Sequence, residues 1–175
     1  DDGAVRFYDY MFRLEAWFED LGAGAITSVS FSAAAADDAD GAAAAKPGAT
    51  SLDFAVPDFV VGTRSATILG LEAALFREID STARRGTVLV QGMADEVHGV
   101  ACHPHKPLLL IACFSGGLYL WDYAEKLLVM VRMFNAERLK PVTVAFDPSG
   151  EYVAVGFASG VVKLLDPREL QDLFS

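Results

Sequence analysis

Short apolar runs separated by turn-forming residues occupy most of the chain, and they predict β-strands. Runs such as "LLLIACF" (108–114) and "YVAVGF" (152–157) are almost continuously hydrophobic, which is typical of strands buried on both faces. Glycine, proline, serine and aspartate gather between the runs, as in "HPHKP" (103–107) and "DPSGE" (147–151). The pattern therefore predicts an all-β chain of short strands joined by tight turns.

One eight-residue frame occurs four times, with a small or turn-forming start, an apolar middle and a carboxylate end. Its copies are "DGAVRFYD" (2–9), "SATILGLE" (65–72), "SGGLYLWD" (115–122) and "SGVVKLLD" (159–166). A second element, centred on Val29, Val100 and Val144, precedes the last three copies. The valine lies 22 residues before the acidic end in the last two units and 43 before it in the first. The basic period is therefore about 44 residues, with insertions in one unit.

A period of about 40–45 residues with four short strands per unit is typical of a β-propeller blade. The copy ending in "YLWD" (119–122) carries the Trp-Asp pair, and on these residues the sequence resembles the WD-repeat family. The resemblance implies an all-β WD-repeat β-propeller, here a partial ring of two complete and two partial four-stranded blades. Of the His–Ser/Thr–Asp–Trp tetrad found in many members, only Trp121 is clear, so these blades are expected to depend on apolar packing.

The repeat divides the chain into four units. They are a partial blade with the third and fourth strands (1–20), a blade with insertions at 33–55 and 73–86 (21–93), a blade (94–137) and a partial blade with the first three strands (138–175). The expected first strands are 26–32, 97–103 and 142–147, and the second strands are 58–63, 108–113 and 152–157. The third strands are 4–9, 66–72, 117–122 and 161–166, and the fourth are 12–18, 87–91 and 127–133.

Two partial blades imply a piece of a larger propeller, because a partial ring exposes strand edges and bare sheet faces. The alternative is a complete small protein whose first and last strands complete one another's blade. The third strand occurs in both partial units, so that closure would require one copy to be displaced.

The two insertions are the candidates for partner contacts. Segment 33–55 is rich in alanine, with Gly and Pro breakers, and is expected to be a disordered loop; the alternative is a segment that folds on a partner. Segment 73–86 has apolar residues at helical spacing beside arginines, and it predicts a short helix. Its candidate docking residues are Leu75, Phe76, Arg77, Arg84 and Arg85, and the alternative is drift in a tolerant loop.

Composition and spacing argue against several kinds of chemistry. The formal net charge of −10, without a basic stripe, predicts no contact with nucleic acid or anionic membranes. Two cysteines fit a reducing compartment. His98, Cys102, His103 and His105 lack the spacing of a tetrahedral zinc site, so no metal site is predicted. No nucleophile motif or phosphate-binding loop occurs, so we expect no catalytic residues, no cofactor, no small-molecule substrate and no enzyme activity.

Three longer stretches are more specific than the repeat. They are "VRFYDYMFRLEAWFEDLGAGAITSVSFS" (5–32), "VHGVACHPHKPLL" (97–109) and "DPSGEYVAVGFASGVVKLLD" (147–166). They resemble the cilia- and flagella-associated WD-repeat proteins of the calmodulin- and spoke-associated complex. The resemblance implies a non-catalytic scaffold of the cytoplasm and cytoskeleton, in the ciliary or flagellar axoneme. There it would link radial spokes to doublet microtubules and bind other protein subunits, at the radial spoke base and in a calmodulin-containing complex.

Two other classes of function are weighed against the scaffold. A generic WD-repeat adaptor would read a peptide or assemble a cytosolic complex, and it would need a charged or aromatic pocket near the ring's centre. A propeller enzyme would need convergent acids, histidines or a metal at the axis, which this segment lacks.

Overall fold

The computed structural model describes residues 3–19, 21–22, 24–31, 58–71, 86–93 and 95–174. These residues form β-strands and turns, and no helix occurs among them. The first sheet pairs β1 (Val5–Tyr8) with β2 (Leu14–Phe18). The second contains β3 (Ile26–Phe31), β4 (Phe59–Thr63), β5 (Thr67–Leu71) and β6 (Thr87–Gln91).

The third and fourth sheets repeat this arrangement. The third contains β7 (Val97–Cys102), β8 (Leu108–Cys113), β9 (Gly117–Asp122) and β10 (Leu127–Met133). The fourth contains β11 (Pro141–Phe146), β12 (Val153–Phe157) and β13 (Val162–Leu165). Within each sheet, consecutive strands pair antiparallel in chain order. All thirteen described strands lie within two residues of their predicted ends, so the all-β expectation is confirmed for the residues that the structure describes.

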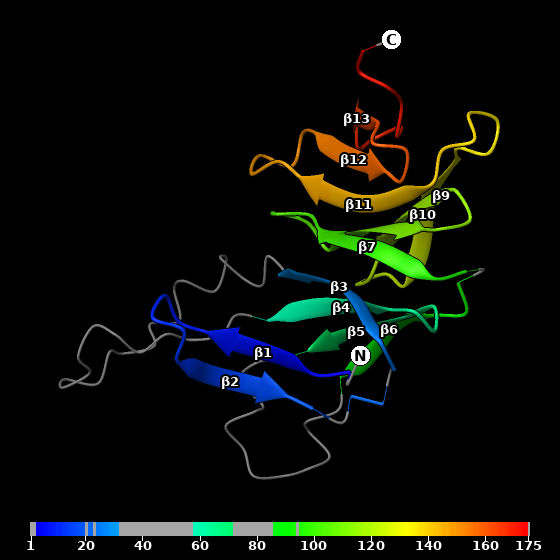
Figure 1. Ribbon diagram of the computed structural model, residues 1–175. Helices are drawn as coiled ribbons and strands as arrows, with labels where there is room; N and C mark the ends of the chain where they lie inside the picture. The colour runs from blue at the N-terminus through cyan, green and yellow to red at the C-terminus, as the bar shows by residue number, and fades with distance from the viewer. Residues whose placement is uncertain are drawn as a thin grey trace.

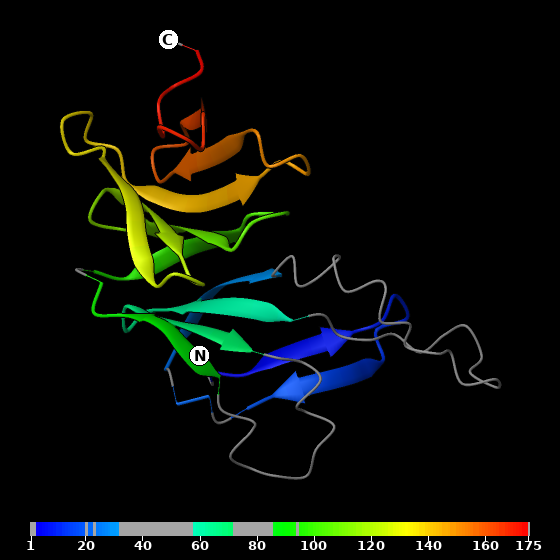
Figure 2. The ribbon, with the colours of Figure 1, turned by 180° about the vertical axis from the view of Figure 1, so that it is seen from behind.

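The four sheets are stacked face to face in chain order (Figure 1), and the view from behind shows the same order (Figure 2). The first strands of the second, third and fourth sheets are neighbours: β7 lies against β3 on one side and β11 on the other. Gly99 in β7 permits the close approach to β11, since a Cβ there would lie 3.1 Å from the Cα of Thr143. On the other side, the backbone N–H of Cys102 donates to the Oγ of Ser30 at 3.0 Å.

Three apolar clusters fill the spaces between the sheets. Strand alternation sends side chains of the third sheet in two directions. Val100 and Ile111 pack toward the second sheet, whereas Ala101 and Leu110 pack toward the fourth. Phe18 and Phe59 pack edge to face between the first and second sheets, with ring centroids 4.9 Å apart. A sheet buried on both faces explains why its strands lack a polar side.

The C-terminal segment extends the fourth sheet beyond the three strands that the repeat predicts. Asp172 bridges Leu165 of β13, and the N–H of Leu173 donates to the carbonyl oxygen of Leu164 at 2.9 Å. A tight turn precedes this pairing, because the N–H of Leu170 donates to the carbonyl oxygen of Asp166 at 2.7 Å. Residues 171–173 therefore begin to pair along the outer edge of β13, at the position that the fourth strand occupies in the third sheet.

Candidate interaction surfaces

The docking residues predicted from the sequence lie outside the described residues. These are Leu75, Phe76, Arg77, Arg84 and Arg85, and the alanine-rich insertion 33–55 lies outside as well. The docking role of the five residues and the disorder of the insertion stay predictions. The surfaces that follow are built from the described residues alone.

The histidines and cysteines that first suggest a metal site lie in separate environments. Cys102 and Cys113 are free thiols buried in the apolar cluster between the second and third sheets. Burial raises the pKa of Cys102 to about 11 and that of Cys113 to about 12, so both remain protonated at neutral pH. Across the part of the chain that the structure describes, no group of three His, Cys, Asp or Glu side chains is placed to hold a metal. The two thiols therefore behave as packing residues.

His103 is a buried turn anchor at the junction of the third and fourth sheets. Its Nδ1 accepts the backbone N–H of His105 at 3.0 Å and that of Lys106 at 3.1 Å. Its ring packs on Phe146 of β11 with centroids 5.1 Å apart. Burial lowers the pKa of His103, and the positive charge of Lys106 lowers it further. The neutral ring is thus the form that holds the turn.

A mixed group of charged and aromatic side chains gathers where β7 and β11 begin, and we call it the loop-end cluster. It comprises Arg64, Glu96, His98, Phe114 and Lys140. The His98 ring stacks on Phe114 at 4.8 Å, and the Nζ of Lys140 lies 4.2 Å from the centroid of the same ring. The Nε2 of His98 is 3.2 Å from a carboxylate oxygen of Glu96, whose other oxygen is 3.9 Å from Arg64. Three sheets contribute to this partly exposed surface.

A second charged group joins the third and fourth sheets, and we call it the inter-sheet ionic cluster. It comprises Arg132, Glu137, Lys163 and Asp172. Asp172 lies 2.7 Å from both Arg132 and Lys163, and Lys163 also pairs with Glu137. The Arg132 guanidinium lies 4.5 Å from the centroid of the fully buried Phe134 ring. The hydrogen bonds that Lys163 donates to Asp172 and to Glu137 raise the pKa of Lys163. The cluster ties the C-terminal segment to the third sheet.

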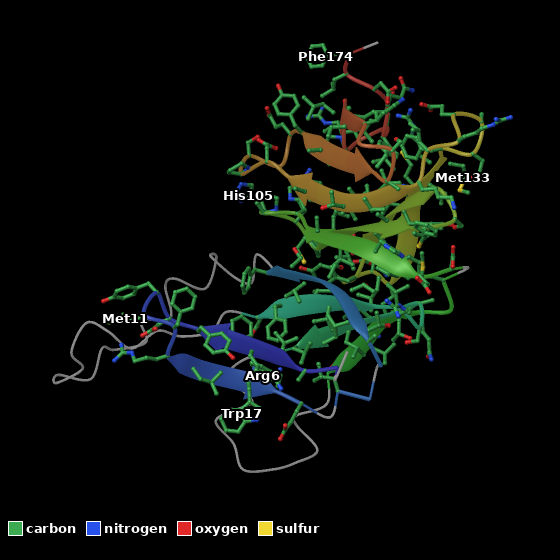
Figure 3. The ribbon with its side chains drawn as sticks, viewed as in Figure 1. Arg6, Met11, Trp17, His105, Met133 and Phe174 are labelled. Carbon is green, nitrogen blue, oxygen red and sulfur yellow. The ribbon has the colours of Figure 1, made fainter. Side chains whose placement is uncertain are left out.

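Apolar faces are exposed at both ends of the stack. On the fourth sheet, Val162 is 68% exposed and Leu164 is 44% exposed. Their counterparts in the repeated frame, Leu118 and Leu120, are 0% and 3% exposed because the fourth sheet covers them. At the other end, Trp17 lies on the outer side of the first sheet, far from Phe174 (Figure 3). Both end faces therefore resemble faces that are covered elsewhere in the same molecule.

One face of β3 is also exposed, although the equivalent faces of β7 and β11 are covered. Val29 and Phe31 are exposed, whereas Val100 and Val144, which correspond to Val29 in the repeat, are buried against the preceding sheet. The first sheet contains two described strands, too few to cover β3. The repeat and the burial pattern thus agree on which face is bare.

Trp121, the aromatic member of the Trp-Asp pair, packs against the cluster between the second and third sheets. Its indole Nε1 is buried and has no hydrogen-bond partner among the described residues. Asp122 instead caps its own turn, accepting the backbone N–H groups of Ala124 and Glu125 at 2.9 Å each. Apolar packing, rather than a polar tetrad, thus holds the Trp121 ring in place.

Within the described residues, no helix has the length and apolar character that a membrane crossing needs.

No family model matches the chain. The chain is 38% identical over 174 residues to the Cilia- and flagella-associated protein 251 of Chlamydomonas reinhardtii. The aligned region covers 99% of this chain and 21% of that protein. It is 32% identical over 179 residues to the protein of the same name in Tetrahymena thermophila. This aligned region covers 97% of this chain and 18% of that protein.

A shorter match reaches a differently named protein. The chain is 40% identical over 87 residues to the Echinoderm microtubule-associated protein-like 4 of Homo sapiens. This aligned region covers 49% of this chain and 8% of that protein. The chain spans about a fifth of the length of the two longer-matching relatives. Over almost all its residues, it is therefore homologous to one segment of the proteins named Cilia- and flagella-associated protein 251.

Proposed function

We propose that the four sheets are consecutive blades of a WD-type β-propeller that extends beyond this chain. The bare end faces support this architecture. Val162 and Leu164 occupy repeat positions that are buried by the next sheet in the preceding unit. A further sheet packed on the fourth would bury them in the same way, and a sheet with all four strands before β3 would cover Val29 and Phe31.

We propose further that the chain is a segment of a Cilia- and flagella-associated protein 251 and serves as a scaffold in the axoneme. There it would link radial spokes to doublet microtubules by binding other protein subunits of the spoke base and of a calmodulin-containing complex. The similarity over 99% of the chain to the Chlamydomonas reinhardtii protein of that name carries the proposal. A scaffold of stacked sheets offers many exposed loops and edges for such contacts.

The proposed role is non-catalytic and needs no cofactor, nucleic acid, membrane or small-molecule substrate. The thiols of Cys102 and Cys113 are buried and protonated, so neither is poised as a nucleophile. His103 is held neutral by burial, and its Nδ1 is already occupied by two backbone donors. These side chains stabilise the fold, which fits a scaffold better than an enzyme.

A peptide-reading adaptor is the second candidate, and the loop-end cluster favours it. His98 stacks on Phe114, the Nζ of Lys140 lies over the same ring, and Arg64 lies 3.9 Å from Glu96. Such a surface suits an acidic peptide, because the charged groups of Arg64 and Lys140 can pair with carboxylates beside the partly buried Phe114 ring. This activity would belong to a cytosolic complex or add to the scaffold role.

Proximity labelling in isolated flagella tests the two candidates. The full-length protein that contains this chain is fused to a labelling enzyme, and a subunit of known position elsewhere in the axoneme serves as the control. The scaffold proposal expects labelled spoke-base and doublet proteins that remain after detergent extraction of the membrane and matrix. Release of the fusion with the soluble matrix, labelling only cytosolic proteins, would contradict the scaffold and favour the adaptor.

A further inference from the structure

The turn between β1 and β2 presents two large apolar side chains to solvent. Met11 is 59% exposed and Phe12 is 87% exposed. Figure 3 shows Met11 at the tip of this hairpin, beyond the end of the sheet. Other exposed apolar residues of the first sheet, such as Trp17, lie on its face, where a preceding blade would cover them. The tip lies beyond that face, so blade stacking does not account for it.

The turn holds these side chains in a defined position. One carboxylate oxygen of Asp9 accepts the backbone N–H of Met11 at 2.8 Å and that of Arg13 at 2.9 Å. The other oxygen accepts the Nε of Arg13 at 2.7 Å, and the N–H of Phe12 donates to the carbonyl oxygen of Asp9 at 3.0 Å. Phe12 itself has a φ of 60°, a left-handed conformation that is unfavourable for a residue with a side chain. Lys126, in the turn between β9 and β10, also has left-handed backbone with a φ of 56°, so this conformation belongs to the turn and does not explain why its side chains are apolar.

The corresponding turn of the third sheet, between β9 and β10, is built with polar residues. The sequence "DYMFRL" (9–14) corresponds in the repeat to "DYAEKL" (122–127). Asp122 caps its turn by accepting the backbone N–H groups two and three residues on, whereas the Asp9 carboxylate accepts those two and four residues on. Ala124 and Glu125 occupy the positions of Met11 and Phe12. The apolar tip is therefore not required by the turn.

From these observations we propose that Met11 and Phe12 are an anchor that inserts into an apolar pocket of a neighbouring protein subunit. The proposal rests on the scaffold function and names one of its docking points. An aromatic side chain contributes roughly 150–250 Å² of contact area. The two side chains therefore match a hot-spot anchor, which occupies the centre of a standard interface of about 800 Å² per partner.

The charges near the tip fit a protein pocket rather than a lipid surface. Asp9 and Arg13 neutralise each other across 2.7 Å, so the tip itself carries no net charge. The chain as a whole has a formal net charge of −10, which opposes approach to an anionic bilayer. An uncharged apolar tip on an acidic chain is suited to a dry pocket in another protein.

Site-specific photo-crosslinking in isolated axonemes tests the anchor. A diazirine amino acid replaces Met11 in the full-length protein, and a second sample carries it at Ala124 in the matched turn. We expect position 11 to crosslink to apolar residues of one other protein, at a yield at least tenfold above position 124. Crosslinks from position 11 only to lipid, only to a second copy of the same chain, or no more than at position 124 would overturn the proposal.

A substitution experiment supplies the energetic test. The double variant Met11→Ala, Phe12→Glu copies the residues of the matched turn, and Phe12→Asn is a second variant that tolerates left-handed backbone. The control is Met11→Leu, Phe12→Tyr. We expect the double variant and Phe12→Asn to bind the crosslinked subunit at least tenfold more weakly, with the thermal midpoint unchanged and the control close to wild type. Unchanged binding in a folded Phe12→Asn variant would overturn the anchor.

The two proposals fail in different ways. If the unmodified protein is absent from the axoneme, the scaffold function fails and the anchor fails with it. If the unmodified protein is present and both tip variants keep the same contact, the anchor alone fails.

Discussion

The second position of the repeated frame explains why small residues begin each copy. Gly3, Ala66, Gly116 and Gly160 have φ values of 69°, 59°, 102° and 85°, so all four copies turn through left-handed backbone there. Glycine adopts this conformation freely, whereas alanine is strained in it. The backbone requirement is thus common to all copies, and one of them meets it with the less favourable residue.

Ala66→Gly is expected to stabilise the protein by about 1 kcal/mol, because it relieves the left-handed strain. The reverse change, Gly160→Ala, should destabilise it by a similar amount. Gly160 is a clean partner for this comparison, since a Cβ there meets no atom within 4 Å and the effect comes from the backbone alone. Urea unfolding of the two variants measures both effects. A destabilised Ala66→Gly variant would show that the turn does not bear this strain.

His103 should make stability depend on pH. Burial lowers its pKa in the folded protein, and its unprotonated Nδ1 accepts two backbone N–H groups. The folded state therefore binds this proton less readily than the unfolded chain, whose histidine pKa is about 6.5. The stabilisation is complete above that value and is lost as the pH falls through the folded pKa. We expect the thermal midpoint to fall between pH 7.5 and pH 5.5.

One variant distinguishes His103 from other titrating groups. His103→Gln offers an oxygen in place of Nδ1 and does not titrate, so its midpoint should be lower at pH 7.5 but less dependent on pH. An equal slope for wild type and His103→Gln would contradict the assignment.

At the scale of the element, the period of the sequence was sufficient to place the strands. Each strand combines a continuous apolar run with flanking turn residues, and these are local signals. The pairing of residues 171–173 with β13 was missed because "QDLF" (171–174) has a polar start and is too short to read as a strand. The inter-sheet ionic cluster was missed for another reason. Arg132 and Asp172 are forty residues apart, and only the stacking of two sheets brings them together.

The candidate surfaces were less predictable than the strands. The sequence drew attention to the arginine pair Arg84 and Arg85, which lies outside the described residues, and it treated "DYMFRL" (9–14) as a turn and a strand start. The contrast with "DYAEKL" (122–127) was present in the alignment of the repeats. Exposure of Phe12 and its left-handed backbone, however, are three-dimensional properties that no composition reveals.

The ionic cluster should hold the C-terminal segment on the edge of β13. The N–H of Leu173 donates to Leu164, and the neighbouring Asp172 is fixed by Arg132 and Lys163. Lys163→Met removes one cation, and we expect it to weaken the segment by about 1 kcal/mol, equivalent to about fivefold faster amide exchange at Leu173. Hydrogen-exchange NMR measures this rate. Lys106→Met, at an exposed lysine outside the cluster, is the control and should leave the rate unchanged.

At the scale of the whole molecule, each sheet is a repeated unit that cannot bury its two faces alone. The valines at 29, 100 and 144 face the preceding sheet, and the residues after them in the inner strands face the following one. Burial of one unit therefore depends on its neighbours on both sides. The bare faces at the two ends of the stack follow directly from this dependence, and they are the strongest structural reason for proposing a larger ring.

The proposed ring predicts that Leu164 belongs to a core in the full-length protein and to the surface in this chain. In the 175-residue chain, Leu164→Ala should change the free energy of unfolding by less than about 0.5 kcal/mol, since the side chain is partly exposed. In the full-length protein, a following sheet should cover it, and the same change should destabilise by about 2–5 kcal/mol. Leu120→Ala, at the equivalent buried position, should destabilise both forms by that amount. If denaturant unfolding of the full-length protein shows Leu164→Ala to be as mild as in the short chain, no further sheet covers this face and the propeller proposal fails.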